Sequence, residues 1–394
     1  MTIPFCTAPF HGALIETDKS VRPCCIWKGE AIGDLKTQTL NDVLNSDHLK
    51  HIQKTMLEGS YPTNCDQCVE REKLAGKSVR QGIYGMVPYL GNNKLTYLEF
   101  NSSNLCNLVC AGCGPSWSSA WVTFIEDNGE WTELRKSDIH RATWKLHPPQ
   151  PNFANNFFKD TDFSALAVVM IKGGEPFLNK ENILLLEHLD NIGILPNIEV
   201  IVTTNGTYTS DRFLTLLGKA KSVKFWMSID GVEKLNQYIR FDPKNSALSH
   251  TDNIKQNVIE YASLDNIKIS SAFTIQAHNV FRLEQLQQFW EHEIKPINPN
   301  RILPVYRCEH ILMYPDELSL QVFSEHTRHQ LADKYESLNG KSWYNSVISV
   351  LRKEVTNSDL LHNRFVKYTE AIDRTRPYKF LDLVPEAKDE MRYW

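Results

Sequence analysis

Apolar and polar residues follow two different patterns along this chain, and the change comes near residue 94. Beyond that point, short apolar runs typical of buried strands alternate with segments in which apolar residues recur at helical spacing. The expected strands are residues 95–100, 165–172, 198–204, 223–229, 267–275 and 301–307. Six strand–helix units predict an α/β fold with a parallel sheet, either an open barrel or a doubly wound sheet. In both architectures the chemistry lies at the carboxyl ends of the strands.

The residues before 94 have the pattern of a smaller α+β domain. Residues 13–25 read as a hairpin that turns at residues 18–20 and ends at a pair of cysteines. Residues 39–59 read as one helix, because Thr39 and Asp42 have capping-box spacing and Gly59 follows the last apolar residue. Residues 81–93 read as a linker. We expect domains over residues 1–85, 86–310 and 311–394, the last of them helical.

Composition narrows the class of protein. Of 394 residues, 42% are hydrophobic and 23% charged, and the net charge is −4. These values are ordinary for a soluble protein and argue against nucleic acid as a main partner. We find neither an apolar run of membrane-spanning length nor a secretory signal at the start, so a cytoplasmic protein without a membrane partner is expected. In that compartment, nine clustered cysteines indicate metal binding rather than disulfides.

Three of these cysteines form a loop directly after the first strand of the larger domain: Cys106, Cys110 and Cys113. Their spacing allows three thiolates to surround one small inorganic group. One interpretation is a zinc site that a distant His or Cys completes. The other is a [4Fe–4S] cluster in which one iron keeps an open coordination position for a ligand. The spacing alone does not decide between them.

The C-x3-C-x2-C loop after a first strand resembles the signature of the radical SAM superfamily. The resemblance implies a partial (βα)6 barrel of the TIM type. It also implies that S-adenosylmethionine (SAM) fills the open position on the cluster. Reduction of that cluster, by an external donor such as flavodoxin or ferredoxin, then cleaves SAM to methionine and a 5′-deoxyadenosyl radical. The missing fourth cysteine ligand is thus the place where the cofactor enters.

A second segment of the resemblance is "GGEP" at the end of the second strand, with Gly173, Gly174 and Glu175. In similar proteins this segment holds the amino group of SAM, for which the Glu175 carboxylate is a natural counter-charge. Asn205, which ends the third strand in "VTTNGT", is assigned to the same cofactor site. The alternative for the "GGEP" segment is a plain strand-to-helix turn.

Further matches follow on the next strands. Ser228 and Asp230 of "SIDG" resemble the family residues that face the ribose hydroxyls. Arg240 resembles the arginine near the SAM carboxylate, a pairing suited to a bidentate guanidinium. Thr274 and Gln276 resemble a segment near the adenosine. The alternatives are an Asp-Gly turn for the "SIDG" motif and a surface charge for Arg240.

One position departs from the family pattern, and one cysteine has no assigned cluster. Gly112 stands where the family commonly has a large residue, so packing against the adenine would have to come from elsewhere, such as Trp117 or Trp121. Cys308 lies just past the sixth expected strand. In family epimerases a cysteine returns a hydrogen atom to the substrate radical, so Cys308 is the candidate catalytic residue. A buried free cysteine is otherwise a small apolar residue.

The amino-terminal cysteines supply enough thiolates to close a second site, either as a zinc site or as a [4Fe–4S] cluster. Residues 6–80 resemble the SPASM/twitch auxiliary module of radical SAM enzymes, here placed before the barrel instead of after it. The resemblance implies the shorter twitch form with one cluster. Its expected ligands are Cys6, Cys24, Cys65 and Cys68, with Cys24 preferred over Cys25 as the first cysteine of the pair.

Together these expectations describe a radical SAM enzyme of oxidoreductase or isomerase type with two [4Fe–4S] clusters. It would abstract a hydrogen atom from a small metabolite or a sugar- or nucleotide-like substrate, with oxidation or epimerisation assisted by the auxiliary cluster. The first alternative is a maturase of a ribosomally made peptide. The second, from a different class, is a zinc-binding scaffold or interaction protein.

Overall fold

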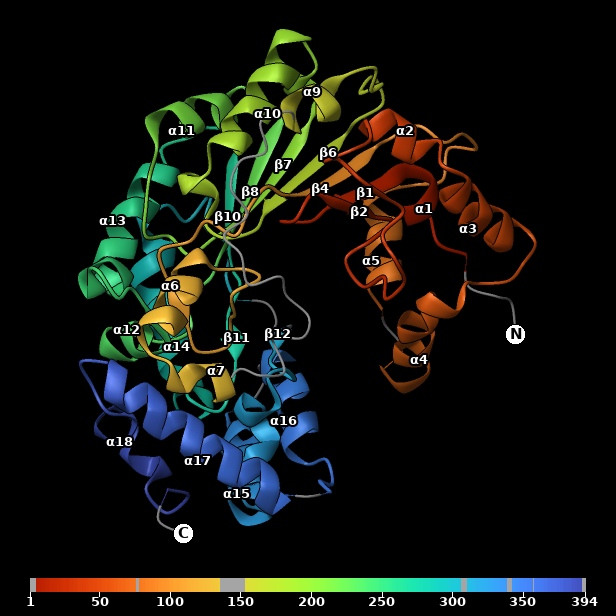
Figure 1. Cartoon of the computed structure of the whole chain (residues 1–394). Coiled ribbons are helices and arrows are strands. Elements are labelled where there is room, and N and C mark those ends of the chain that lie inside the picture. The colour runs from red at the N-terminus through yellow and green to blue at the C-terminus, as the bar shows by residue number, and fades with distance from the viewer. Residues whose placement is uncertain are drawn as a thin grey trace. The chain divides into compact units, whose positions relative to one another are not determined.

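The computed structural model of this chain describes residues 5–75, 78–134, 153–305, 310–338, 342–356 and 358–391 (Figure 1). Two compact units divide the chain. The first unit comprises Met1–Leu105, Leu146–Thr203 and Asp211–Val223. The second unit comprises Cys106–Lys145, Thr204–Ser210 and Lys224–Trp394. The chain therefore passes between the units several times, and the first passage separates Leu105 from the three-cysteine loop.

The mixed α/β fold with a mostly parallel sheet is confirmed. Eight strands form one sheet in the order β10-β8-β7-β6-β4-β1-β2-β3. Five of the six strands expected in the larger domain are present, namely β4 (Tyr97–Asn101), β6 (Val168–Lys172), β7 (Glu199–Thr204), β8 (Ser222–Met227) and β10 (Ile267–Ser271). In the first unit, β4 pairs in parallel with β6, and β6 pairs in parallel with β7. The carboxyl ends of these strands therefore share one edge of the sheet.

The expected amino-terminal hairpin is also present, and it joins the parallel sheet. Strand β1 (Gly12–Ile15) pairs antiparallel with β2 (Ser20–Arg22) and in parallel with β4. The turn forms because the Asp18 carboxylate accepts hydrogen bonds from the backbone N–H and the hydroxyl of Ser20. Lys19, between them, has a positive φ of 71°. Strand β3 (Gly33–Asp34) completes this edge.

The sixth expected strand, residues 301–307, was predicted wrongly over its described part, residues 301–305, and residues 306 and 307 lie outside the described residues. In the described residues of this segment the pairing is one parallel bridge, between Ile302 and Ile269. Pro304 follows, and a proline has no N–H to donate to a ladder. Parallel pairing resumes between two short strands, β11 (Thr274–Ile275) and β12 (His310–Ile311).

Two expectations about the smaller domain also need correction. The single helix expected over residues 39–59 is two helices, α2 (Leu40–Leu44) and α3 (Asp47–Leu57). The predicted capping box of Thr39 is present, but Ser46 caps a second helix by accepting from the Leu49 N–H. The stretch read as a linker contains most of helix α5 (Val79–Met86). Helix α4 (Asp66–Ala75) precedes it and begins between the last two amino-terminal cysteines.

Helices follow the strands as expected. In the first unit, α10 (Lys180–Asn191) and α11 (Asp211–Gly218) pack against each other beside β6 and β7 (Figure 1). In the second unit the main helices are α6 (Ser119–Asp127), α7 (Glu130–Leu134), α13 (Thr251–Tyr261) and α14 (Leu283–Phe289). The helical carboxyl-terminal region is confirmed by α15 (Glu325–Ser337), α16 (Asn345–Leu351), α17 (Ser358–Thr375) and α18 (Phe380–Leu383).

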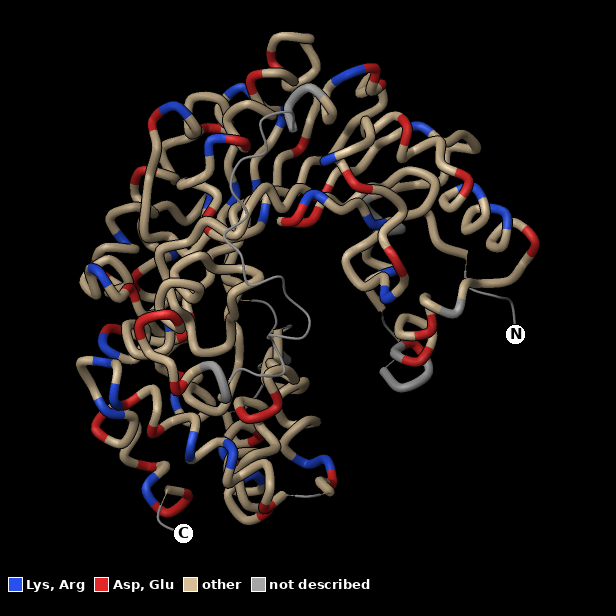
Figure 2. Tube along the Cα trace, in the orientation of Figure 1, with Lys and Arg blue, Asp and Glu red and all other residues tan. Residues whose placement is uncertain are grey.

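Acidic and basic residues are interspersed along the described chain (Figure 2). This distribution agrees with the absence of a strong charge imbalance in the sequence. Across the ranges that the structure describes, every helix is too short or too polar to cross a membrane.

Candidate active site

The three-cysteine loop lies in the second unit, where one local hydrogen bond and a pairing with a distant strand hold it. Cys110 is part of strand β5 (Val109–Cys110), which pairs antiparallel with β9 (Arg240–Phe241), so Cys110 stands opposite Arg240. The Cys113 N–H donates to the Cys110 carbonyl at 3.0 Å. All three thiols of the loop, those of Cys106, Cys110 and Cys113, belong to half-buried residues. The loop is thus an ordered turn with three half-buried thiols.

Two predicted cofactor residues of the second unit contact the sulfurs of this loop. The Asn205 amide nitrogen lies 3.9 Å from Cys106 Sγ, and the Arg240 Nη1 lies 3.8 Å from Cys110 Sγ. Asn205 is itself oriented by the Thr207 N–H and hydroxyl, which both donate to its Oδ1 at 2.9 and 2.6 Å. The structure therefore brings an amide and a guanidinium against two of the three thiols.

Asp230 and Arg240 are paired with each other, which the sequence did not predict. Arg240 Nε donates to Asp230 Oδ2 at 2.8 Å, and the Asp230 side chain is almost fully buried. The other oxygen, Oδ1, accepts from the Thr274 N–H at 2.7 Å. Burial opposes the positive charge, but the neighbouring Asp230 carboxylate raises the pKa of Arg240 above its usual value. Asp230 thus holds a permanent cation beside Cys110. Ser228, the first residue of the "SIDG" motif, is half-buried directly after β8.

The carboxyl-terminal helical region holds the loop through two of its backbone carbonyls. Tyr368 of α17 donates its hydroxyl to the Ala111 carbonyl at 2.8 Å, and Arg376 donates to the Val109 carbonyl at 2.7 Å. Burial lowers the pKa of Arg376 to about 10. Neither residue was predicted from the sequence. They lie more than 250 positions from the loop, and neither is part of a recognisable motif.

The glycine pair of "GGEP" lies in the first unit, at the end of β6. Gly173 and Gly174 have positive φ values of 82° and 52°. A Cβ on Gly174 would lie 2.2 Å from the Leu105 carbonyl oxygen, and one on Gly173 would lie 3.0 Å from the Ser103 carbonyl oxygen. Only glycine fits such an approach. The pair therefore packs against the segment that ends at Leu105, the residue directly before Cys106 in the chain.

Glu175 is fully buried in the same unit. Its N–H donates to the Leu105 carbonyl at 2.8 Å, and its carboxylate caps the short helix Pro176–Leu178 by accepting from the Phe177 N–H at 3.2 Å. The backbone role is independent of the counter-charge role that the sequence predicted. That second role stays a prediction.

Gln276 and Gly112 mark a further part of the loop's surroundings in the second unit. Gln276 is 1% exposed, and its buried Oε1 has no hydrogen-bond partner within the described structure. A Cβ on Gly112 would lie 3.8 Å from that oxygen and 3.2 Å from the Leu312 side chain. An orphaned acceptor beside the residue before Cys113 fits a bound group that carries a hydrogen-bond donor, such as an adenine amine.

The aromatic residues expected near the adenine behave differently from each other. Trp121 is fully buried, packs edge-on against Phe124 and Trp131, and donates its indole N–H to the Cys110 carbonyl at 3.0 Å. It thus supports the loop from within the protein core. Trp117 is exposed. The candidate catalytic residue, Cys308, lies outside the described residues.

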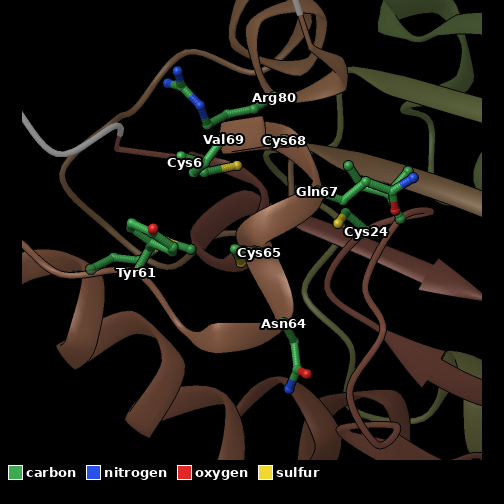
Figure 3. A pocket seen from close by; sticks show the side chains of 11 residues that line it. Cys6, Cys24, Tyr61, Asn64, Cys65, Gln67, Cys68, Val69 and Arg80 are labelled. Carbon is green, nitrogen blue, oxygen red and sulfur yellow. The ribbon is translucent and has the colours of Figure 1, made fainter. Parts of the chain in front are cut away.

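The amino-terminal cysteines gather around a cavity in the first unit (Figure 3). Cys6, Cys24, Cys65 and Cys68 all line this cavity, which we call the auxiliary cavity. Its remaining wall consists of Ile26, Met56, Tyr61, Asn64, Gln67, Val69 and Arg80. Four thiols in a largely apolar wall form a donor set that fits a fully ligated iron–sulfur cluster. Cys25 does not belong to the wall and is exposed.

Burial sets the protonation of these thiols when no metal is bound. It raises the pKa of Cys6 to about 11 and that of Cys65 to about 12, and it raises the pKa of Cys24 further still. In the three-cysteine loop, burial raises the pKa of Cys110 to about 12. Because metal ligands are thiolates, binding a cluster at neutral pH must release protons.

Among the described residues, no three His, Cys, Asp or Glu side chains converge closely enough to hold a single metal ion.

The auxiliary cavity defines an iron–sulfur class of domain, and the family comparison agrees. Residues 6–69 match the family model of the SPASM domain, an iron–sulfur cluster-binding domain. The match spans all five amino-terminal cysteines. The prediction of an auxiliary iron–sulfur domain is confirmed. The match supports the prediction of a radical SAM enzyme, the class in which this auxiliary module is expected.

Two solved structures match parts of this chain at low identity and low TM-score. Native anSMEcpe with bound AdoMet and Cp18Cys peptide is 15% identical, with 65% of this chain and 62% of that chain covered and a TM-score of 0.36. Streptococcus suis SuiB bound to S-adenosylmethionine is 14% identical, with 62% and 44% covered and a TM-score of 0.30. The chain spans less than two thirds of each of these proteins. No curated protein sequence matches this one significantly.

Proposed function

We propose that this chain is a radical SAM enzyme with one auxiliary [4Fe–4S] cluster. When bound, the cluster of the three-cysteine loop and SAM supply a 5′-deoxyadenosyl radical that takes a hydrogen atom from the substrate. The observation that carries the proposal is the neighbourhood of the loop. Asn205 and Arg240 lie against its sulfurs. Neither an amide nitrogen nor a guanidinium is an iron ligand of this class, so these two side chains would leave the fourth iron position open for SAM.

The proposed roles follow from what each side chain offers. Cys106, Cys110 and Cys113 hold the cluster. Arg240, fixed by Asp230, presents a cation beside Cys110, where it would bind the SAM carboxylate. Because an arginine stays protonated at neutral pH, the SAM carboxylate would face a permanent positive charge on Arg240.

The glycine pair and Glu175, which lie in the first unit, carry proposed roles of their own. Gly173 and Gly174 bring the backbone close to the segment before Cys106, which supports their predicted contact with the amino group. Glu175 anchors that backbone through the Leu105 carbonyl.

Ser228 remains the candidate for the ribose hydroxyls, and Asp230 acts mainly by orienting Arg240.

For the substrate we propose a small metabolite or a sugar- or nucleotide-like molecule, oxidised or epimerised with help from the auxiliary cluster. The composition does not indicate a basic nucleic-acid surface. A ribosomally made peptide is the second candidate. The SPASM match favours it, because many proteins with this auxiliary module modify peptides. An external one-electron donor such as flavodoxin or ferredoxin belongs to both candidates.

The test is an anaerobic reconstitution followed by metal analysis and product analysis. We expect about eight irons per chain, two clusters of four, and 5′-deoxyadenosine after addition of dithionite and SAM. The matched control replaces Cys106, Cys110 and Cys113 by Ala and should keep about four irons but form no 5′-deoxyadenosine. Zinc in place of iron, without SAM cleavage, would refute the proposal and favour the zinc scaffold.

A further inference from the structure

One charged side chain belongs to the wall of the auxiliary cavity. Among the described residues that line it, Arg80 alone carries a full charge, and the others are thiols, apolar side chains, a tyrosine and two amides. Figure 3 shows Arg80 on the side of the cavity where Cys6 and Cys68 lie. A cation in a wall of this composition is less screened by water than one on an exposed surface, so its charge acts on a group bound in the cavity.

Arg80 is fixed in place by Glu72 of α4 and by the backbone before Cys6. Its Nε donates to Glu72 Oε1 at 3.0 Å, and its Nη2 donates to Glu72 Oε2, which makes the pair bidentate. Its Nη1 donates to the Phe5 carbonyl at 2.8 Å. The side chains of Arg80 and Glu72 are 16% and 18% exposed. A guanidinium held by three hydrogen bonds keeps its position when the charge in the cavity changes.

A four-thiolate cluster carries a net negative charge, and reduction by one electron makes that charge more negative. Net charge near the cluster is one of the quantities that set its reduction potential. A fixed cation in the wall stabilises the reduced form more than the oxidised form. Glu72 reduces this effect but does not remove it, because Arg80 lines the cavity and Glu72 does not.

We propose that Arg80 is a positioning residue that raises the reduction potential of the auxiliary cluster, and that Glu72 limits this rise. The inference rests on the proposed function, because it requires a cluster in the auxiliary cavity. Arg80 does not touch a reacting atom. It sets how readily the cluster accepts an electron.

Two substitutions test the sign of the effect. Arg80→Gln removes the cation and should lower the equilibrium constant for one-electron reduction about tenfold, which is about 59 mV. Glu72→Gln leaves the cation uncompensated and should shift the potential in the opposite direction. Arg80→Lys keeps the charge and should stay close to the parent protein.

The readout is an EPR-monitored redox titration of the full-length chain. All variants carry Ala at Cys106, Cys110 and Cys113, so that the auxiliary cluster is the one titrated. The control is Arg212→Gln, which removes an exposed cation of the same unit that pairs with Glu187. This control should leave the potential unchanged.

The outcomes separate the inference from the function on which it rests. A lower potential in Arg80→Gln and a higher one in Glu72→Gln support it, and unchanged potentials in both overturn it. If Arg80→Gln fails to hold iron, the other two variants decide. The inference then requires a higher reduction potential in Glu72→Gln and an unchanged reduction potential in Arg80→Lys. If the parent chain binds zinc or no cluster in the auxiliary cavity, the inference and the auxiliary part of the proposed function both fail.

Discussion

Alanine at Gly174 should damage the SAM site far more than alanine at another glycine with a positive φ. A Cβ at this position would lie 2.2 Å from the Leu105 carbonyl oxygen, and non-bonded carbon and oxygen atoms do not approach within 3.0 Å. The carbonyl would have to move by about 0.8 Å, the difference of these two distances. It is also held at 2.8 Å by the Glu175 N–H. The displacement would therefore reach Cys106, the next residue in the chain.

Gly193 provides the matched control. Its φ is 76°, and a Cβ there would meet nothing within 4 Å. Gly193→Ala therefore isolates the cost of a positive φ, about 1 kcal/mol. Gly174→Ala adds the collision to that cost, so we expect a loss of about 3 kcal/mol or more in the free energy of unfolding.

Both variants would be compared anaerobically by urea denaturation and by equilibrium dialysis of SAM. We expect Gly193→Ala to bind SAM like the parent protein and Gly174→Ala to bind it at least about tenfold more weakly, which is about 1.4 kcal/mol. Equal stability and equal SAM affinity in the two variants would show that the glycine pair does not shape the loop before Cys106, and the reasoning would be wrong.

Three further predictions concern the thiols and the buried ion pair. Cys24→Ser should lower the iron content from about eight to about four per chain, whereas Cys25→Ser should leave it unchanged; equal losses, measured by iron analysis, would contradict the choice of Cys24. Asp230→Asn should weaken SAM binding about tenfold by releasing Arg240, since a buried charge pair loses its orientation when one partner is removed; equilibrium dialysis at parental affinity would refute this. Burial raises the pKa of the Cys6 thiol from 9.0 to about 11. In the metal-free protein the protonated thiol therefore makes a contribution to stability that is full below pH 9 and is lost as the pH rises through 11. The free energies of unfolding of the metal-free parent and of Cys6→Ala, measured by urea titration, should converge over this range, and a constant difference between them would exclude the effect.

Local patterns predicted the parts of the fold that depend on neighbouring residues. The hairpin at Asp18, the capping box of Thr39 and the parallel strands each rest on interactions within a few residues or on apolar periodicity. The break at Ser46 was missed, because a second capping residue inside an apolar helical pattern is a weak signal beside the periodicity. The lost strand at residues 301–305 shows the same limit, since Pro304 outweighed the apolar run.

The site was predictable where a motif marks it and unpredictable where tertiary contacts build it. Cysteine spacing indicated both thiol groups, and the family match confirms the amino-terminal domain. The pairing of Asp230 with Arg240 was not predicted, because the motif assigns each residue to a ligand rather than to the other. Tyr368 and Arg376 support the loop through backbone carbonyls, and such contacts leave no pattern in either segment of the sequence.

If the proposed function is right, the cluster of the three-cysteine loop keeps an open iron position for SAM. The EPR spectrum of the dithionite-reduced Cys24→Ser protein, with and without SAM, tests this position, because the variant should retain only the cluster of that loop. We expect a [4Fe–4S] signal whose g values shift when SAM is added, and no signal at all once Cys110 is also replaced by Ala. A reduced cluster whose spectrum is the same with and without SAM would contradict the proposed open position.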